Sequence, residues 1–335
     1  MKRLFWLVAM LAICLAAVAQ TQYRSGNFIF KLYEPTNGDS PYAVVSGVVS
    51  YPGTEVTIPG TVEKNGVSYT VTEIGSFLFD GFNCKLNKLT IPPTIKIFNR
   101  SAFSYMERCD EVHISDLSAW AQADFKNISA NPIRYMLYLN GEPLNNVEFS
   151  TDVTKISNYA FYYCASIQSV SIPSSVTSIG ETLFEGCTNL ETLTISEGLK
   201  EIGKLAFYNC SKLNDVSFPS SLASVGAYSF SNSGLKSVVF SSTDEPLNLE
   251  KAVFFNCRKL SSVRLPDNIT TLPDMLLGNC YSLKSLTIPP SIKTVRNNPL
   301  LDSNNLVRLD ISDLSAWCRI DFINHSMPRD RYNLT

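Results

Sequence analysis

The sequence has very few of the residues on which most enzyme and metal sites depend. Only two of its 335 residues are histidines, His113 and His325, and no cysteines have the C-x-x-C spacing of a structural zinc site. It also lacks the G-x-S-x-G, H-E-x-x-H, Walker and dinucleotide-binding motifs. We therefore predict that the protein is not an enzyme, and we expect no catalytic residue, metal or cofactor.

Neither sign of charge dominates the chain. It has 28 basic and 30 acidic residues, for a formal net charge of −2, so nothing indicates a nucleic-acid partner. No stretch after the N-terminus approaches the roughly 18 apolar residues of a membrane helix, so we predict no membrane span. The content of 45% hydrophobic and 17% charged residues is typical of a folded chain.

The first residues have the pattern of a signal peptide, which we assign to residues 1–19. Two basic residues precede the apolar stretch 4–15, and a small-x-small sequence then ends at Ala19. We predict cleavage before Gln20, and hence a secreted or cell-surface protein. A lipoprotein signal at Cys14 is the alternative, but an isoleucine stands before it where such signals need a small residue.

A repeat with a period of 23 residues covers most of the remaining chain. Phenylalanine recurs at this interval, and cysteine follows it three residues later: Phe161, Phe184, Phe207 and Phe230, with Cys164, Cys187 and Cys210. After one extra residue the register resumes at Cys257 and Cys280. The unit reads L-x-x-[LV]-x-[IF]-P-x-[ST]-[VIL]-x-x-[IV]-G-x-x-[AL]-F-x-x-C. A repeat this regular predicts a solenoid, and we assign coils to residues 56–111 and 144–306.

Each part of the unit predicts a local structure. The alternating L-x-x-V-x-I segment indicates a half-buried strand, and the proline after it ends the strand. The A-F-x-x-C segment indicates a short helical turn. The residue before the cysteine is usually Gly, Asn or Asp, which predicts a left-handed residue at the end of that turn: Gly81, Gly186, Asn209, Asn232, Asn256, Asn279 and Asp302, with Tyr163 as the exception.

With proline, glycine, alanine-phenylalanine and cysteine at fixed offsets, the unit resembles that of the BspA-like subfamily of leucine-rich-repeat proteins. The predicted fold is accordingly an α/β repeat, a right-handed leucine-rich-repeat solenoid. It has one parallel sheet on one face and short helical turns on the other. The resemblance implies a surface or secreted protein of the Bacteroidetes type, because members of this family are described as adhesins.

Three segments depart from the repeat. Residues 20–55 have β-type alternation, and we predict an N-terminal β cap there. Residues 112–143 hold the divergent sequence Ile114–Trp120, in which Ser115 or Asp116 can cap a short helix, followed by a predicted hairpin. The same seven letters return 197 residues later, so residues 307–335 are a second, incomplete copy. Because this copy stops before its hairpin, we expect a truncated sequence.

The repeat cysteines can be read as disulfide partners, as in many secreted proteins, or as buried thiols. Other coils place Phe82, Met106, Ser233 or Ser303 at the same position. A position that accepts these residues is a packing position, so we expect free thiols.

The outward positions of the predicted sheet are the candidate partner-contact surface. Its middle carries serine and threonine, and the charged candidates are Lys88, Glu111, His113, Asp215, Arg264, Arg308 and Asp310. Aromatic residues on the turn side form either an exposed adhesive edge or a cover for the core, and we favour the cover: Tyr162, Tyr163, Tyr208 and Phe255.

The function that these observations favour is an extracellular, adhesin-like protein-interaction surface on a monomeric repeat protein. Its partners would be extracellular proteins or glycans of host or microbial origin. The alternatives are a glycan-binding or nutrient-capture surface protein, and a structural spacer for a further C-terminal domain.

Overall fold

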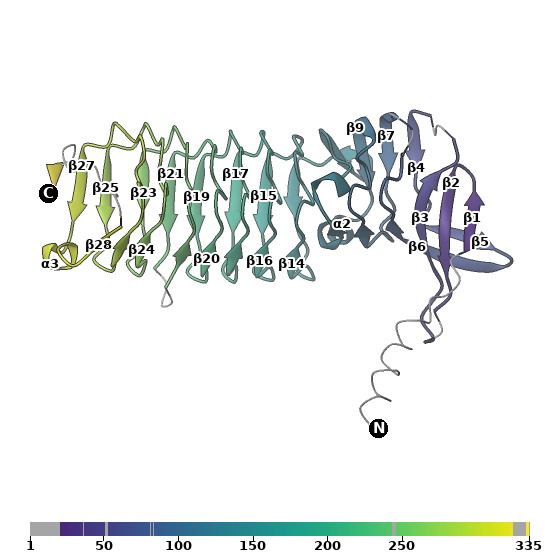
Figure 1. The fold of residues 1–335 in the computed structure, drawn as a ribbon, viewed down its shortest axis with the longest axis horizontal. Helices are drawn as coiled ribbons and strands as arrows, with labels where there is room; N and C mark the ends of the chain where they lie inside the picture. The colour runs from purple at the N-terminus through teal and green to yellow at the C-terminus, as the bar shows by residue number, and fades with distance from the viewer. Residues whose placement is uncertain are drawn as a thin grey trace, which may run out of the picture.

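A computed structural model describes residues 21–35, 37–50, 53–80, 82, 84–242, 246–323 and 333–334. They form an elongated stack of coils, from the N-terminal strands at one end to the C-terminal module at the other (Figure 1). The predicted signal peptide and its cleavage site between Ala19 and Gln20 lie outside the described residues.

Two rows of parallel strands run along the stack (Figure 1). The first ladder is formed by the L-x-x-V-x-I segments: β4 (Glu55–Thr57), β7 (Cys84–Thr90), β9 (Met106–Ile114), β11 (Met136–Leu139), β13 (Asn146–Glu148), β15 (Ser169–Ile172), β17 (Thr192–Ile195), β19 (Asp215–Phe218), β21 (Ser237–Phe240), β23 (Ser262–Arg264), β25 (Ser285–Ile288), β27 (Arg308–Ile311) and β29 (Asn333–Leu334). Its register repeats the sequence period, since Val170 pairs with Leu193 in the next coil.

The second ladder was not predicted, because we expected one parallel sheet. It consists of two-residue strands: β8 (Ile97–Phe98), β10 (Asp124–Phe125), β14 (Lys155–Ile156), β16 (Ser178–Ile179), β18 (Glu201–Ile202), β20 (Ser224–Val225), β22 (Asn248–Leu249), β24 (Thr271–Leu272), β26 (Thr294–Val295) and β28 (Asp321–Phe322). Two residues per coil are too few to show an alternating pattern, so the sequence does not reveal this ladder. The fold is therefore a parallel-sheet β-solenoid.

The A-F-x-x-C segments are turns and not the predicted short helical turns. In the coils from residue 159 onward each such segment contains two left-handed residues four positions apart, such as Thr182 (φ 58°) and Gly186 (φ 74°). The second of the two is the left-handed position that the sequence predicts, and the first interrupts any helix. The amides of Thr182, Phe184 and Gly186 donate to carbonyls of the next coil at 2.8–2.9 Å, so this side is also tied coil to coil.

Helices occur in the described residues only where the repeat is interrupted. They are α2 (Leu117–Gln122), the 3₁₀ helix η1 (Ile128–Ala130) and α3 (Leu314–Trp317). Asp116 caps α2, because its carboxylate accepts a hydrogen bond from the Ala119 amide at 2.9 Å.

The divergent module replaces lost backbone donors with side chains. In regular coils the amide of the repeated phenylalanine donates to the next coil, as from Phe161 to the Leu183 carbonyl. Ala160 occupies the position of Leu183 in its own coil. Its carbonyl accepts instead from the indole N–H of Trp120 at 2.8 Å and from the side-chain Nδ2 of Asn131 at 3.1 Å. Trp120 is thus both a buried ring and the hydrogen-bonding link to the next coil.

The second module repeats this geometry. Asp313 caps α3 through the Ala316 amide at 2.9 Å. Asn333 pairs with Arg308, just as Met136 pairs with Glu111 in the first module. The burial of the shared residues differs: Leu314 is 70% exposed, and no residue of α3 is buried.

The N-terminal strands form an antiparallel extension of the stack. β1 (Thr21–Ser25), β2 (Phe28–Tyr33) and β3 (Tyr42–Val48) pair in sequence order. The strand β6 (Val67–Ile74) connects them to the coils, since it pairs with β3 and with β8 and also forms a hairpin with β5 (Thr61–Lys64).

The core is a column of stacked phenylalanine rings. Ring centroids are 5.2 Å apart for Phe161 and Phe184, 5.4 Å for Phe184 and Phe207, and 5.0 Å for Phe207 and Phe230, and all four side chains are fully buried. Each ring covers the ring of the preceding coil. A single coil is therefore not stable by itself, and neighbouring coils stabilise one another.

The repeat cysteines are free thiols that donate across the coil interface. The thiols of Cys187 and Cys210 each donate to a phenylalanine carbonyl in the preceding coil at 3.3 Å. Ser303 makes the same bond to the Leu277 carbonyl at 2.6 Å, which explains why serine replaces cysteine. The position thus favours a small residue with a donor.

We expect thiol reagents to distinguish one cysteine from the others. Of the eight cysteines after residue 19, seven are buried and Cys318 is exposed. Burial raises the pKa of Cys164 and of Cys257 to about 11, so the reactive thiolate is scarce at neutral pH. A colorimetric thiol assay without reductant should therefore report one fast-reacting thiol in the native protein and eight in denaturant. A denatured count near zero would contradict the free-thiol structure.

Ser229 provides a test of column packing. It occupies the position of Ala160 and Ala206 and is fully buried, and its hydroxyl has no hydrogen-bond partner among the residues that the structure describes. Ser229→Ala should raise the free energy of unfolding by about 1 kcal/mol, because an unpaired buried hydroxyl is costly. As a control, Ser231→Ala should lower it by about the same amount, because that hydroxyl donates to the Phe255 carbonyl at 2.8 Å. Urea denaturation measures both changes.

Candidate interaction surface

All seven charged candidates lie at outward positions of the first ladder. Lys88 faces Glu111 in the adjacent strand, and Asp215, Arg264 and Arg308 are exposed. Arg308 and Asp310 form an ion pair, with 3.2 Å between Nε and Oδ1. The candidates therefore make two local groups, one on β7 and β9 and one on β27, with Asp215 and Arg264 standing apart between them.

The structure gathers Glu111, His113 and Tyr138 into one cluster. The Glu111 carboxylate lies 2.8 Å from Nε2 of His113, and the imidazole stacks on the Tyr138 ring at 4.5 Å and 11°. Burial, and then the charge of Glu111 and its hydrogen bond, raise the pKa of Tyr138. His113 is only 12% exposed, because these two neighbours cover it.

Tyr138 is a surface residue that the sequence analysis missed. The sequence predicted a hairpin here, but not which strand lies beside it. Only the parallel pairing of β11 with β9 places Tyr138 beside His113. The hairpin strand β12 (Glu142–Pro143) then pairs on the other side of β11, where Tyr138 faces Pro143. The hairpin therefore interrupts the first ladder between β11 and β13.

A hollow of about 460 Å³ lies beside this cluster. It is lined by Arg108, Cys109, Asp110, Glu111, Arg134, Tyr135, Met136 and Tyr138. The guanidinium of Arg134 donates to the carbonyls of Asn131 at 2.7 Å and Ile133 at 3.1 Å. Burial lowers the pKa of Arg134. The Tyr135 side chain is 63% exposed at the rim, so an aromatic surface is open to a partner here.

On β15 and β17, between the charged groups, the outward side chains are short and polar. Two rows of serine and threonine cross β15 and β17, in which Ser169 pairs with Thr192 and Ser171 with Thr194. At the ends of this stretch Ser169 donates to Asn146, and Ser237 donates to Asp215, each at 2.7 Å. The result is a flat, hydroxyl-rich face.

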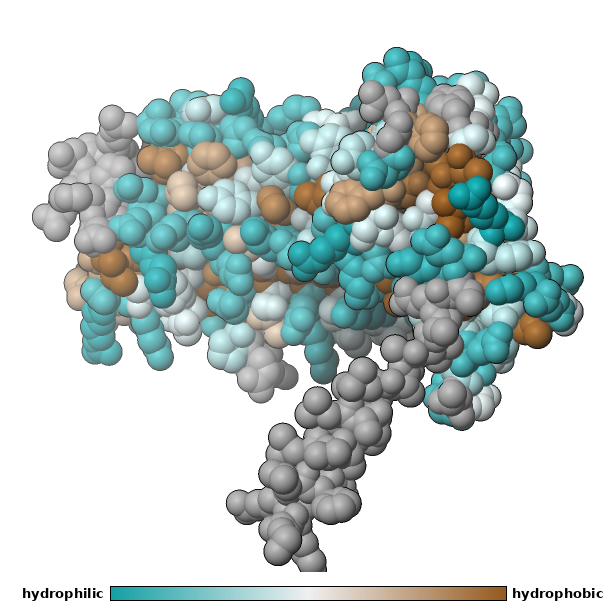
Figure 2. Space-filling model, turned by 45° about the vertical axis from the view of Figure 1, so that its right-hand side comes forward, coloured by the Kyte–Doolittle hydropathy of each residue, from teal (hydrophilic) through white to brown (hydrophobic). Residues whose placement is uncertain are grey.

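The aromatic residues on the turn side cover backbone of the following coil. A Cβ atom on Gly186 would lie 2.7 Å from the Tyr163 ring, and one on Gly278 would lie 2.8 Å from the Phe255 ring. Tyr163 is nevertheless 44% exposed, so the ring has both a packed and an open side. In the view of Figure 2 polar residues predominate, and hydrophobic residues form scattered groups.

Two further findings concern the described residues. No three His, Cys, Asp or Glu side chains come together there as a metal site. None of the described helices is long and apolar enough to cross a membrane.

The stacked coils, the parallel ladders and the open face define a repeat solenoid of the leucine-rich type. The family described as the BspA type leucine rich repeat region matches residues 62–137, 131–250 and 243–318. The chain belongs to this family, as its repeat predicted. A comparison with curated proteins finds no match.

Several solved structures are similar to this chain at low sequence identity. The pneumococcal vaccine antigen PcpA is 17% identical, with a TM-score of 0.54, and the match covers 92% of this chain and 79% of that one. A leucine-rich repeat protein from Eubacterium ventriosum is 16% identical, with a TM-score of 0.50 and coverage of 91% and 94%. A leucine rich cell surface protein from Faecalibacterium prausnitzii is 21% identical, with a TM-score of 0.46 and coverage of 94% and 97%.

Proposed function

We propose that this protein is an extracellular, adhesin-like module that binds other proteins through the first-ladder face. The observation that carries the proposal is the flat face itself, in which hydroxyl rows lie between two charged groups. Such a face suits broad contact with another macromolecule better than the enclosure of a small molecule. One of the similar structures is named as a vaccine antigen, which agrees with an exposed location.

The charged candidates have distinct roles in this proposal. Glu111 lines the hollow, where Tyr135 offers the anchoring ring, and Lys88 and His113 lie beside Glu111 on the same face. Asp215 and Arg264 supply isolated charges, and the Arg308–Asp310 pair ends the face. Aromatic and arginine side chains dominate binding at most protein interfaces, so Tyr135 is the strongest single contact in this proposal.

The proposal also assigns roles to the segments outside the regular coils. Residues 1–19 direct export, and residues 20–55 shield the first coil from solvent and from pairing with other edges. The modules at 112–143 and 307–335 interrupt the regular coils, and in each of them a strand pairs with the strand that precedes it.

The test is binding of the mature chain, from Gln20 onward, to immobilised extracellular-matrix proteins by surface plasmon resonance. Thr192→Arg places a bulky charge on the face and should weaken binding about tenfold or more. Thr177→Arg is the matched control, because this exposed threonine precedes the second ladder, and it should bind like the parent. Equal loss in both variants, or no binding to any matrix protein, would contradict the proposal.

A further inference from the structure

Among the regular coils that the structure describes, the second ladder has one unpaired position, between β22 and β24, which we call the open rung. The unpaired position between β10 and β14 lies at the divergent module. The ladder is continuous from β14 to β22 and again from β24 to β28, but β22 and β24 are not paired in the part of the chain that the structure describes. The interruption follows the extra residue that shifts the repeat register between Phe230 and Cys257.

One column of residues changes its composition at the open rung. In successive coils it holds Gly180, Gly203 and Gly226, where the coils approach so closely that a Cβ atom on Gly226 would lie 2.5 Å from the Lys204 amide nitrogen. The next coils place Glu250 and Pro273 in the same column. A side chain in this column does not by itself prevent pairing, because Arg296 occupies the next position and β24 still pairs with β26. What distinguishes the opening is the proline at its upper edge.

Pro273 lacks the backbone N–H that would pair this coil with β22. At this position Gly226 donates to the Ile202 carbonyl at 2.8 Å, and Arg296 donates to the Leu272 carbonyl at 2.9 Å. Proline has no N–H, so the Leu249 carbonyl receives no such bond from β24. The Leu249 carbonyl is therefore available as a hydrogen-bond acceptor at the gap between β22 and β24.

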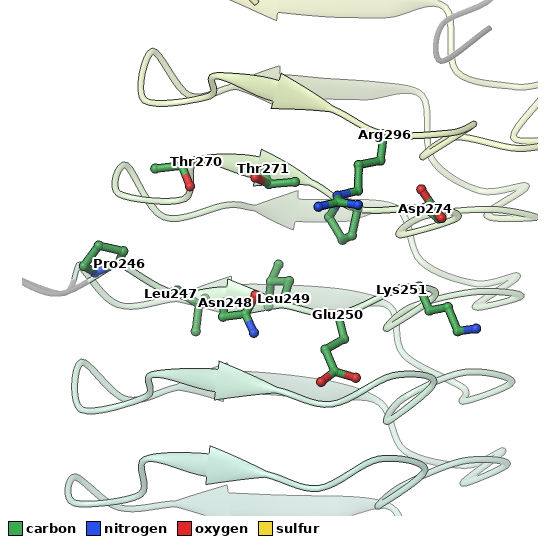
Figure 3. Close-up of a pocket in the computed structure, with 11 residues that line it drawn as sticks. Pro246, Leu247, Asn248, Leu249, Glu250, Lys251, Thr270, Thr271, Asp274 and Arg296 are labelled. Atoms are coloured by element: carbon green, nitrogen blue, oxygen red, sulfur yellow. The ribbon is translucent and has the colours of Figure 1, made fainter. Parts of the chain in front are cut away.

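A cavity of about 490 Å³ occupies the gap (Figure 3). The Glu250 carboxylate is held at its edge by the Ala227 amide at 3.0 Å, and that of Asp274 by the Asn297 amide at 3.0 Å. Arg296 reaches over the gap from the coil above, and Thr271 lies on its upper strand (Figure 3). The buried Leu247, Leu249 and Pro273 supply apolar surface.

We propose that this open rung binds an uncharged sugar residue of a glycan. Each sugar hydroxyl donates and accepts hydrogen bonds, and the cavity offers both kinds of partner. The Leu249 carbonyl and the two carboxylates accept, while the Arg296 guanidinium and the threonine hydroxyls donate. Because both signs of charge line the cavity, an ionic ligand meets one of them unfavourably. Its volume lies in the range of small-ligand sites, about 300–1,000 Å³.

This site is independent of the protein-binding face, because it belongs to the other ladder. A ligand here would occupy one rung and would leave the hydroxyl rows of β15 and β17 free. The two proposals therefore fail separately, since Thr192→Arg tests the face and variants of the rung test the cavity.

The experiment is saturation-transfer difference NMR on the mature chain. The probes are glucose, galactose, mannose, N-acetylglucosamine and their disaccharides, at millimolar concentration. At least one sugar should receive saturation from the parent protein. Arg296→Gln should reduce its affinity about tenfold, since it removes a charged hydrogen-bond donor. Thr177→Arg, outside the cavity, should leave the signal unchanged.

A repaired variant gives the decisive comparison. Glu250→Gly combined with Pro273→Gly restores the glycine column and the missing N–H, so the rung should close and the sugar signal should disappear while the protein stays folded by circular dichroism. If the repaired variant does not fold, Arg296→Gln and Thr271→Val still test the cavity. No transfer to any sugar from the parent, an equal signal from these variants, or a stronger signal from glucuronate than from glucose would overturn the proposal.

Discussion

Trp120→Ala lowers the free energy of unfolding by about 3–5 kcal/mol, while Trp317→Ala lowers it by about 1 kcal/mol or less. The two residues occupy the same place in an identical heptapeptide, so the local sequence cannot cause the difference. Trp120 is buried against Phe98 and Phe125, at centroid distances of 5.4 and 5.0 Å, and donates to the Ala160 carbonyl. Trp317 is only partly buried, and its indole has the Phe322 ring as its aromatic neighbour.

Urea denaturation followed by intrinsic fluorescence measures this pair directly. Trp120 and Trp317 are the only tryptophans after residue 19, so each variant leaves the other indole as the reporter. Trp120→Phe separates the two contributions, because it keeps a ring and removes the N–H, and should cost about 1–2 kcal/mol. Equal losses for Trp120→Ala and Trp317→Ala would show that the coil after the first module does not depend on this tryptophan.

Phe207→Ala should be about as costly, with a loss of about 3–5 kcal/mol. The ring is fully buried between the rings of Phe184 and Phe230, so its removal leaves a cavity that two neighbouring coils share. Because each coil is stable only against its neighbours, the loss should also weaken the adjacent interfaces. Hydrogen exchange should therefore show faster exchange in β18 and β20 as well as a lower global stability.

Phe77→Ala is the matched control for Phe207→Ala, because it removes a phenylalanine ring outside the buried column. Phe77 also lies on the turn side, but 47% of it is exposed, and it meets Tyr105 at 5.9 Å on the surface. It should change the free energy of unfolding by about 1 kcal/mol or less. A comparable loss in the two variants would mean that burial in the column is not what stabilises the coils.

The repeat positions show how far the sequence predicts the local backbone. Gly186 and Asn209 belong to residue types that tolerate φ > 0, and both are left-handed as predicted. Leu205 is equally left-handed (φ 58°), but leucine gives no signal of it. Its conformation comes from the bond that its amide makes to the Ala227 carbonyl of the next coil. Contacts between coils thus override a local preference that predicted a helical turn.

The candidate surface also has features that the sequence predicts and features that only the tertiary structure shows. The outward positions of Lys88, Glu111 and His113 follow from strand alternation, so they could be predicted. The cluster with Tyr138 depends on which strand pairs with β9, and the open rung depends on how Pro273 meets a carbonyl in another coil. Both the Tyr138 cluster and the open rung depend on contacts between coils, so the periodicity of a single segment does not predict them.

By itself the sequence determined the family, the 23-residue period, the buried column and the outward rows, because each of these repeats within one coil. Only the tertiary structure decided the second ladder, the turns in place of helices, the hollow beside Tyr138 and the open rung. The physical reason is that these features arise where one coil meets the next. There, hydrogen bonds and close backbone contacts join residues about 23 positions apart.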